Sequence, residues 1–224
     1  MEEYKKDFIG FLIKSRALLF GEFRLKSGRL SPYFINAGVF NNGPLIEGLG
    51  HFFAKKLTET LKENEYDIIF GPAYKGIPLA VATASSLWKD FKLEKGWAFN
   101  RKESKEHGDR GAFVGSEIRD GSKILLVDDV FTTGGTKEEA IEQLKGIADI
   151  RLAGVLIAVD RQEKDSEGKN AIEEFERKYE TKVHPIVTAK EIFEYAHNRD
   201  IEGKIHVNDE IKKKFEDYLL EYGV

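Results

Sequence analysis

The fold of this 224-residue chain is decided by one segment, Ile124-Leu-Leu-Val-Asp128-Asp129-Val130-Phe131-Thr132-Thr133-Gly134-Gly135-Thr136. An apolar strand, predicted over Ile124–Val127, ends in two carboxylates, and a Thr/Gly loop leads into a helix predicted over Lys137–Leu144. Ligands of open α/β sheets bind beyond the carboxyl ends of the strands. Glycines let backbone N–H groups approach a ligand closely, and the following helix N-terminus presents more of them. We therefore interpret the loop as a cradle for one phosphate group.

The paired acids Asp128 and Asp129 indicate a second kind of ligand beside that phosphate. Carboxylates accept hydrogen bonds from sugar hydroxyls, hold a hydrated metal, or face a developing cation. The chain contains neither the G-x-x-x-x-G-K-[ST] loop nor a G-x-G-x-x-G turn that opens a helix. A Gly/Thr loop on its own is more often a helix cap, so it is the two acids after a buried strand that make the segment specific.

Strands and helices alternate on both sides of this segment. Short strands that are apolar on both faces are typical of a buried parallel sheet, and their alternation with helices indicates βαβ units. We predict an α/β fold with a central, mainly parallel sheet and helices on both faces. The other expected strands are Asp67–Phe70, Trp97–Phe99, Ala153–Val159 and Val183–Val187, and the other expected helices are Ile77–Trp88, Ala171–Lys178 and one opened by the capping-box spacing Thr188–Glu191.

The two ends of the chain add to this sheet. Apolar periodicity predicts helices over residues 4–19, 45–61 and 209–222, and alternation around Ser27-Gly28 predicts a hairpin over Phe23–Ile35. No Pro/Gly/Ser-rich linker divides the chain. We therefore expect a single domain over residues 1–224, with a small helix/hairpin hood over residues 1–44 and a long loop over residues 101–115.

Composition excludes several classes of protein. The formal charge is -4, without the basic excess typical of a duplex-binding domain, so no nucleic-acid partner is expected. The absence of cysteine excludes disulfides, thiolate metal sites and Cys nucleophiles. The first residues lack the apolar core of a signal peptide, and no charge-free stretch has the composition and length of a membrane span. We expect a soluble, cytoplasmic protein.

Together with the Ile124–Thr136 segment, four other motifs stand in an order that resembles the type I phosphoribosyltransferases, and among them the orotate phosphoribosyltransferase family. The resemblance covers nearly the whole chain. The motifs are Phe20-Gly-Glu-Phe23 with Leu25-Lys26-Ser-Gly-Arg29 and Ser31-Pro-Tyr-Phe34; Phe70-Gly-Pro-Ala-Tyr74-Lys75-Gly76-Ile-Pro78; Phe99-Asn-Arg101-Lys102-Glu103 with Lys105 and His107-Gly108; and Ala158-Val-Asp160-Arg161-Gln-Glu163.

The resemblance implies Mg²⁺-dependent transfer of ribose 5-phosphate from phosphoribosyl pyrophosphate (PRPP) to N1 of orotate, giving orotidine 5′-phosphate and pyrophosphate for UMP synthesis. It implies catalytic roles for Asp128, Asp129, Lys75 and Lys105, and orotate contacts from Phe34, Ile35, Thr132 and Arg161. We expect PRPP to carry Mg²⁺ without a protein metal site. A homodimer that shares lid residues across its interface is also implied. The PRPP-binding residues implied are Lys26, Tyr74, Lys75, Arg101, Lys102, Lys105, His107, Asp128, Asp129, Val130, Phe131, Thr132, Thr133, Gly134, Gly135 and Thr136.

Each of these roles has a plainer alternative. Lys26 and Lys75 read equally as solvated turn lysines, and the charged 101–115 loop reads as a solvated loop. Arg161 would then be a surface cation paired with Glu163 or Asp160. A planar guanidinium at this position also suits the carboxylate of orotate, which it can bind through two hydrogen bonds. A mobile basic loop likewise suits a reaction that releases pyrophosphate, because it can exclude water and neutralise charge.

The sequence departs from the family pattern at two positions. Ile35 stands where many orotate enzymes have Phe, and Thr132-Thr-Gly-Gly-Thr136 differs from their common Thr-Ala-Gly-Thr loop. The loop therefore supports phosphate binding without selecting a base. The alternatives are a transferase for another base, a non-catalytic regulator that binds PRPP or RNA, and a bifunctional enzyme, for which the chain is short.

Overall fold

The computed structural model describes residues 1–25, 27–101, 112–131, 134–165 and 167–224. Its centre is a six-stranded sheet with the strand order β5-β4-β3-β6-β7-β8, in which β5 is antiparallel to β4 and the other neighbours are parallel. The predicted mainly parallel sheet is therefore confirmed. Its strands are β3 (Ile68–Phe70), β4 (Gly96–Asn100), β5 (Phe113–Gly115), β6 (Lys123–Val130), β7 (Arg151–Asp160) and β8 (Val183–Thr188).

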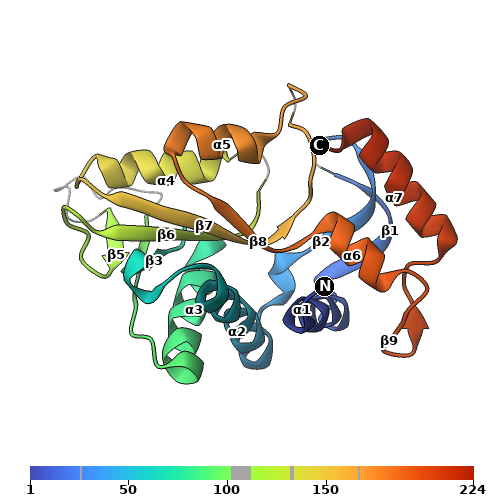
Figure 1. The fold of residues 1–224 in the computed structure, drawn as a ribbon, viewed down its shortest axis with the longest axis horizontal. Coiled ribbons are helices and arrows are strands. Elements are labelled where there is room, and N and C mark those ends of the chain that lie inside the picture. The colour runs from blue at the N-terminus through green and yellow to red at the C-terminus, as the bar shows by residue number, and fades with distance from the viewer. Residues whose placement is uncertain (26, 102–111, 132–133, 166) are drawn as a thin grey trace.

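Helices cover both faces of the sheet, as predicted (Figure 1). Buried side chains of α4 and α5 pack on one face, against a cluster that includes Phe70, Leu126 and Ile157. The neighbouring strand residues, such as Ile69, Leu125 and Leu156, point to the other face and join the core formed with α1, α2 and α3. The helices are α1 (Glu3–Lys14), α2 (Gly43–Thr60), α3 (Gly76–Phe91), α4 (Gly135–Lys145), α5 (Ala171–Tyr179), α6 (Ala189–Ala196) and α7 (Asp209–Tyr222).

The N-terminal hairpin lies beyond the carboxyl ends of the parallel strands, beside α6 and α7 (Figure 1). It pairs β1 (Leu18–Arg24) with β2 (Leu30–Ile35) in antiparallel register. A stack of aromatic rings joins it to the C-terminal helices: Phe193 lies 3.7 Å from Phe215 between ring centroids and meets Phe20 and Tyr33 edge-on. Two short antiparallel strands, β9 (Asp200–Ile201) and β10 (Lys204–Ile205), connect α6 to α7.

Several predicted element boundaries are wrong. The helix expected over residues 4–19 ends at Lys14, because Arg16 has a φ of 60°, which an α-helix does not allow, and β1 already begins at Leu18. The hairpin expected from Phe23 therefore begins five residues earlier. The loop expected over residues 101–115 contains the strand β5 at its end. The strand expected to end at Val127 continues through both acids to Val130, because β7 pairs with it as far as Val159.

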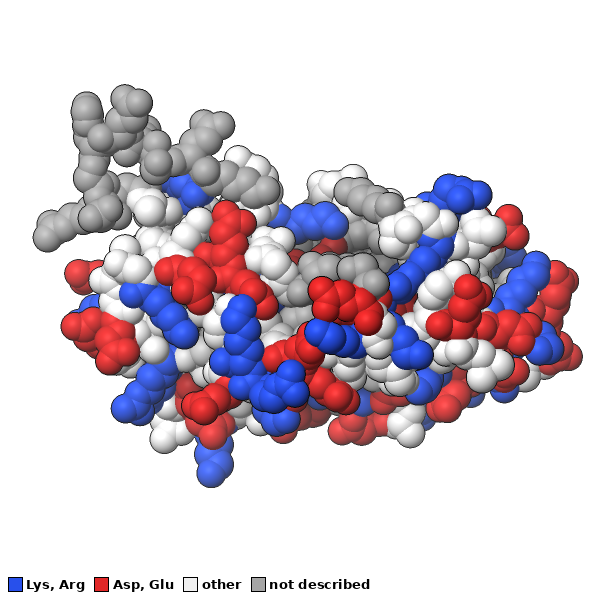
Figure 2. All heavy atoms as spheres, turned by 90° about the horizontal axis from the view of Figure 1, so that it is seen from above, with Lys and Arg blue, Asp and Glu red and all other residues white. Residues whose placement is uncertain are grey.

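The surface mixes charges of both signs. Figure 2 shows Lys and Arg side chains interspersed with Asp and Glu over the face that carries α4 and α5. Among the described residues, no helix combines the length and the hydropathy that a membrane crossing needs.

We expect Phe193→Ala to destabilise the protein by about 3–5 kcal/mol, because the ring is 1 % exposed and its loss leaves a cavity between the hairpin and α7. Urea unfolding measures the change. Leu220→Ala is the control, since Leu220 is 83 % exposed on α7, and its effect should stay within about 0.5 kcal/mol. Equal effects of the two changes would contradict the packing described for Phe193.

Candidate functional site

The candidate site lies where the direction of the sheet changes. The chain runs from β3 to β4 on one side of β3, and later places β6 on the other side. The loops that follow β3 and β6 therefore leave their strands toward opposite faces, and the space between them is where open α/β sheets bind ligands. Asp128 and Asp129 at the end of β6 and Lys75 after β3 meet in this space.

Asp129 joins the two loops. It is 8 % exposed, and its Oδ2 accepts a hydrogen bond of 2.9 Å from the Nζ of Lys75. That hydrogen bond raises the pKa of Lys75 above its ordinary value, so the ammonium stays charged. The Lys75 side chain is otherwise mostly solvent-exposed. The contact places one anion and one accessible cation at the opening of the site.

Asp128 has a partner that sequence reasoning missed. Lys137, in the first turn of α4, is 3 % exposed and forms an ion pair with Asp128. Its Nζ also donates to the carbonyl of Val130 at 3.0 Å. Burial raises the pKa of Asp128, Lys137 opposes that rise, and the neighbouring Asp129 adds to it. Lys137 thus stabilises the ionised form of a carboxylate that its surroundings disfavour.

The loop after β3 is held tightly at its base. A Cβ atom on Gly71 would collide with the carbonyl oxygen of Gly76, so only glycine allows this closure. Asn100, at the end of β4, accepts a 2.9 Å hydrogen bond from the N–H of Ala73 and donates at 2.8 Å to Gln143 on α4. Asn100 is 7 % exposed and was also missed from the sequence, where it stands beside more conspicuous cations.

The start of α4 suits an anion. Gly134 is the N-cap with a φ of 80°, a left-handed conformation that favours glycine, and the next helical residues, Gly135 and Thr136, are exposed. The first N–H groups of an α-helix have no partner within the helix. The predicted phosphate cradle is consistent with this backbone, although its Thr132 and Thr133 lie outside the described residues.

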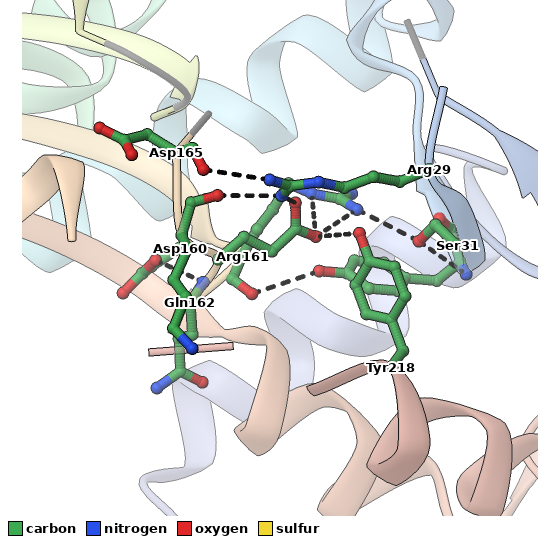
Figure 3. A network of polar contacts seen from close by, with 10 residues as sticks. Arg29, Ser31, Asp160, Arg161, Gln162, Asp165 and Tyr218 are labelled. Carbon is green, nitrogen blue, oxygen red and sulfur yellow. Dashed lines mark hydrogen bonds and ion pairs between the residues drawn. The ribbon is translucent and has the colours of Figure 1, made fainter. Parts of the chain in front are cut away.

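Arg161, directly after β7, is buried and forms several contacts (Figure 3). Its Nε donates to Glu163 at 2.9 Å, its Nη2 reaches Ser31 Oγ at 3.2 Å, and its guanidinium lies 4.2 Å from the ring centroid of Tyr33. The structure thus contains the ion pair with Glu163 that was one interpretation of Arg161. The ion pair is buried beneath the hairpin, however, whereas the alternative interpretation of the sequence expected it on the surface.

Other residues predicted for the site have these positions. Tyr74 and Arg101 are exposed, Phe34 is 36 % exposed and stacks on Phe23, and Ile35 is half-buried. Val130 is half-buried and Phe131 is buried. The ligand roles of these residues stay predictions. The predicted site residues that lie outside the described part of the chain are Lys26, Lys102, Lys105, His107, Thr132 and Thr133.

A parallel sheet with an acid pair, a lysine loop and a helix-opening glycine loop at its direction change is the arrangement expected of a protein that binds a phosphorylated sugar. Comparison with known proteins agrees with that class. The phosphoribosyl transferase domain family matches residues 37–192.

Three relatives that match over nearly the whole chain are all orotate phosphoribosyltransferases. The orotate phosphoribosyltransferase of Clostridium beijerinckii is 42% identical over 100% of this chain and 99% of its own, and that of Bifidobacterium adolescentis is 46% identical over 96% of each. The solved structure of orotate phosphoribosyltransferase from Francisella tularensis has a TM-score of 0.82 and 37% identity, and covers 97% of this chain and 100% of that one. The chain belongs to the phosphoribosyltransferase family and, within it, to the orotate phosphoribosyltransferases.

We expect Lys137→Met to destabilise the protein at pH 7 by roughly 3 kcal/mol, because Asp128 is left as a buried carboxylate without its counter-ion. The pKa of Asp128 is already raised in the folded state, so its ionised form opposes folding above that pKa. The penalty should shrink as the pH falls and the carboxyl group becomes protonated.

Urea unfolding at several pH values measures this difference from the wild-type protein. Lys145→Met, on the exposed part of the same helix, is the control and should change stability by less than about 0.5 kcal/mol. A deficit in the Lys137 variant that is independent of pH would show that Lys137 contributes packing alone.

Proposed function

We propose that this protein transfers ribose 5-phosphate from PRPP to N1 of orotate and releases pyrophosphate, the reaction that its full-length relatives are named for. The observation that carries the proposal is the acid pair at the direction change of the sheet, beside the Lys75 loop. The ring nitrogen of the base is itself the nucleophile, so the protein need not provide one. Its task is to position the two substrates and to stabilise charge.

Two charges develop in this reaction, and the site has groups for both. The anomeric carbon becomes cationic as pyrophosphate leaves, and the carboxylates of Asp128 and Asp129 favour that positive charge and accept hydrogen bonds from the ribose hydroxyls. Lys75, which is accessible and charged, suits the pyrophosphate. The amides at the start of α4 suit the 5-phosphate. Lys105 and the other cations of the 101–115 loop are proposed to complete the pyrophosphate site.

Mg²⁺ is proposed to enter with PRPP. Among the described residues, no group of three or more His, Asp or Glu side chains could hold a metal ion, whereas Mg²⁺ commonly binds through substrate phosphates and one or two carboxylates. The metal would add positive charge on the leaving pyrophosphate. Asp128 and Asp129 are the only acids that we assign near it.

The base is proposed to bind beside Arg161, next to the hairpin. Orotate differs from uracil by a carboxylate, and a buried guanidinium is the natural partner for that group. Phe34, Ile35 and Thr132 are proposed to line the rest of the base site. This pocket, and not the phosphate loop, would select the base.

An ultraviolet assay tests the function directly. Orotate should be consumed only with PRPP and Mg²⁺, while uracil, adenine and hypoxanthine remain unchanged. Arg161→Ala should raise the KM for orotate roughly a hundredfold, the effect of losing a charged, two-pronged contact, with the KM for PRPP changed by less than about threefold. Arg161→Lys keeps the charge without the fork and should recover only part of the affinity.

Circular dichroism checks that both Arg161 variants are folded. Consumption of another base, or of none, by folded wild-type protein would overturn the proposed substrate. An equal rise in both KM values would mean that Arg161 supports the fold and does not bind orotate.

We also propose a homodimer formed along α3. Residues Pro78, Val81, Ser85 and Trp88 are all exposed and repeat at intervals of three and four, so they form one stripe along that helix. Val81 is 38 % and Trp88 57 % exposed, and neighbouring exposed apolar side chains on one helix face suit a protein–protein contact. The stripe begins beside Lys75, so a second copy on it would reach the first copy's site, as the shared lid requires.

Trp88→Glu should shift the protein from dimer to monomer, because a charge buried in an apolar interface is not solvated there. Light scattering after gel filtration measures the mass. Leu220→Glu, an equally drastic change at an exposed residue of α7, should leave the mass unchanged. A wild-type monomer, or a dimer that tolerates Trp88→Glu, would contradict this interface.

A further inference from the structure

Sequence reasoning did not anticipate the contact network to which Arg29, Arg161 and Tyr218 belong (Figure 3). Glu163 is at its centre, because it contacts all three residues. Its Oε1 accepts hydrogen bonds from the Nε of Arg161 and from the hydroxyl of Tyr218, both at 2.9 Å. The same oxygen forms an ion pair with the Nη2 of Arg161 at 2.6 Å. Its Oε2 lies 3.7 Å from Nη1 of Arg29. The partners come from three places that are far apart in the sequence: the hairpin, the end of β7 and the helix α7.

The charges in this network do not balance. Two guanidinium groups, those of Arg29 and Arg161, contact the single carboxylate of Glu163, and all three side chains are less than one-fifth exposed. The carboxylate of the nearby Asp160 is engaged elsewhere, because it accepts a hydrogen bond of 2.7 Å from the N–H of Gln162. Two buried cations that share one anion leave room for a second anion, which is what a carboxylate ligand supplies.

The contacts of Arg161 also define which edge remains for that anion. Glu163 occupies the side edge of the guanidinium, formed by Nε and Nη2. Nη2 additionally contacts Ser31 Oγ, whose own proton goes to the carbonyl of Tyr33 at 2.8 Å. The end of the fork is therefore shared with Ser31 on the Nη2 side, and a carboxylate that approaches from the Nη1 side does not have to displace Glu163.

Backbone contacts hold the loop that carries these residues against α7. The N–H of Lys164 donates to the carbonyl of Tyr222 at 2.8 Å, and the N–H of Val224 donates to the carbonyl of Gln162 at 3.0 Å. Arg29 adds hydrogen bonds from the hairpin to the carbonyls of Lys164 at 2.9 Å and Asp165 at 3.2 Å. Glu163 thus has a fixed backbone as well as fixed side-chain partners.

We propose that Glu163 is a positioning residue for the carboxylate of the base, and that Tyr218 of α7 sets its position. Glu163 binds the side edge of Arg161 and directs the end of its guanidinium toward the ligand. Tyr218 and Arg29 hold Glu163 there, so α7 belongs to the base site although it contributes no residue to the phosphate loops. This inference rests on the proposed function, in which Arg161 receives the carboxylate of orotate.

Tyr218→Phe tests the inference in the full chain, because it removes one hydroxyl and keeps the buried ring. The KM for orotate should rise about tenfold, as expected for the loss of one hydrogen bond to a charged group, while kcat and the KM for PRPP change by less than about twofold. A merely structural hydroxyl would alter both KM values together or neither.

Tyr179→Phe is the matched control. The hydroxyl of Tyr179 contacts Glu142 at 3.5 Å on the opposite side of the sheet, so both KM values should be unchanged. An unchanged KM for orotate in Tyr218→Phe, with wild-type protein active on orotate, overturns this inference alone. Wild-type protein without activity on orotate overturns the proposed function and this inference with it.

Glu163→Gln tests whether Glu163 orients Arg161 for the ligand or competes with the ligand for Arg161. The amide keeps the shape but loses the charge, so Arg161 loses its fixed side contact and the KM for orotate should rise at least as much as in Tyr218→Phe. A lower KM for orotate would mean that Glu163 competes with the ligand for Arg161, and would overturn the positioning role. Circular dichroism and urea unfolding establish that the variants are folded.

Discussion

The architecture of the site depends on burying two adjacent carboxylates at the end of a parallel strand. Asp128 and Asp129 are both largely removed from water, and neighbouring negative charges inside a protein are costly unless each has a partner. In the structure each carboxylate pairs with a lysine from a different element. Lys137 of α4 pairs with Asp128, and Lys75 of the loop after β3 pairs with Asp129. One lysine is buried and permanently engaged, and the other is accessible, so a substrate can share it.

The surroundings of Arg161 follow the same principle with guanidinium groups. The partly buried carboxylate of Glu163 is surrounded by two arginines and a tyrosine hydroxyl. The two halves of the site are built differently, however. The acid pair stands on the central sheet, whereas Arg161 depends on the hairpin and α7, which the aromatic stack of Phe193 and Phe215 joins. In the proposed function, recognition of the base is thereby separated from recognition of the phosphates.

Much of the fold could be predicted because its signals are local. The helix over Asp209–Tyr222 and the capping box at Thr188 have the bounds that periodicity and spacing indicate. The predictions failed where non-local contacts decide the structure. Pairing with β7 extends β6 through the acids, and a positive φ at Arg16 ends the first helix although apolar residues continue.

The site residues divide in the same way into those that local motifs indicate and those that only tertiary contacts reveal. Asp128, Asp129, Lys75 and Arg161 stand in motifs, so the sequence indicates them, and the structure brings the first three together. Lys137 and Tyr218 are ordinary helix residues in the sequence, and Asn100 stands in a motif in which only the neighbouring cations were assigned roles. Only the three-dimensional contacts with Asp128, Ala73 and Glu163 distinguish them.

The backbone pairing of residues 162–164 with residues 222–224 also has a consequence for synthesis of the chain. During translation the loop that carries Arg161 leaves the ribosome about sixty residues before its partner, so the sheet and the phosphate loops are complete first. A nascent chain that has reached only β8 contains the acid pair and Lys75 but lacks the helix that secures Glu163. Under the proposed function, the groups assigned to the sugar phosphate are therefore synthesised before the helix that secures the groups assigned to the base.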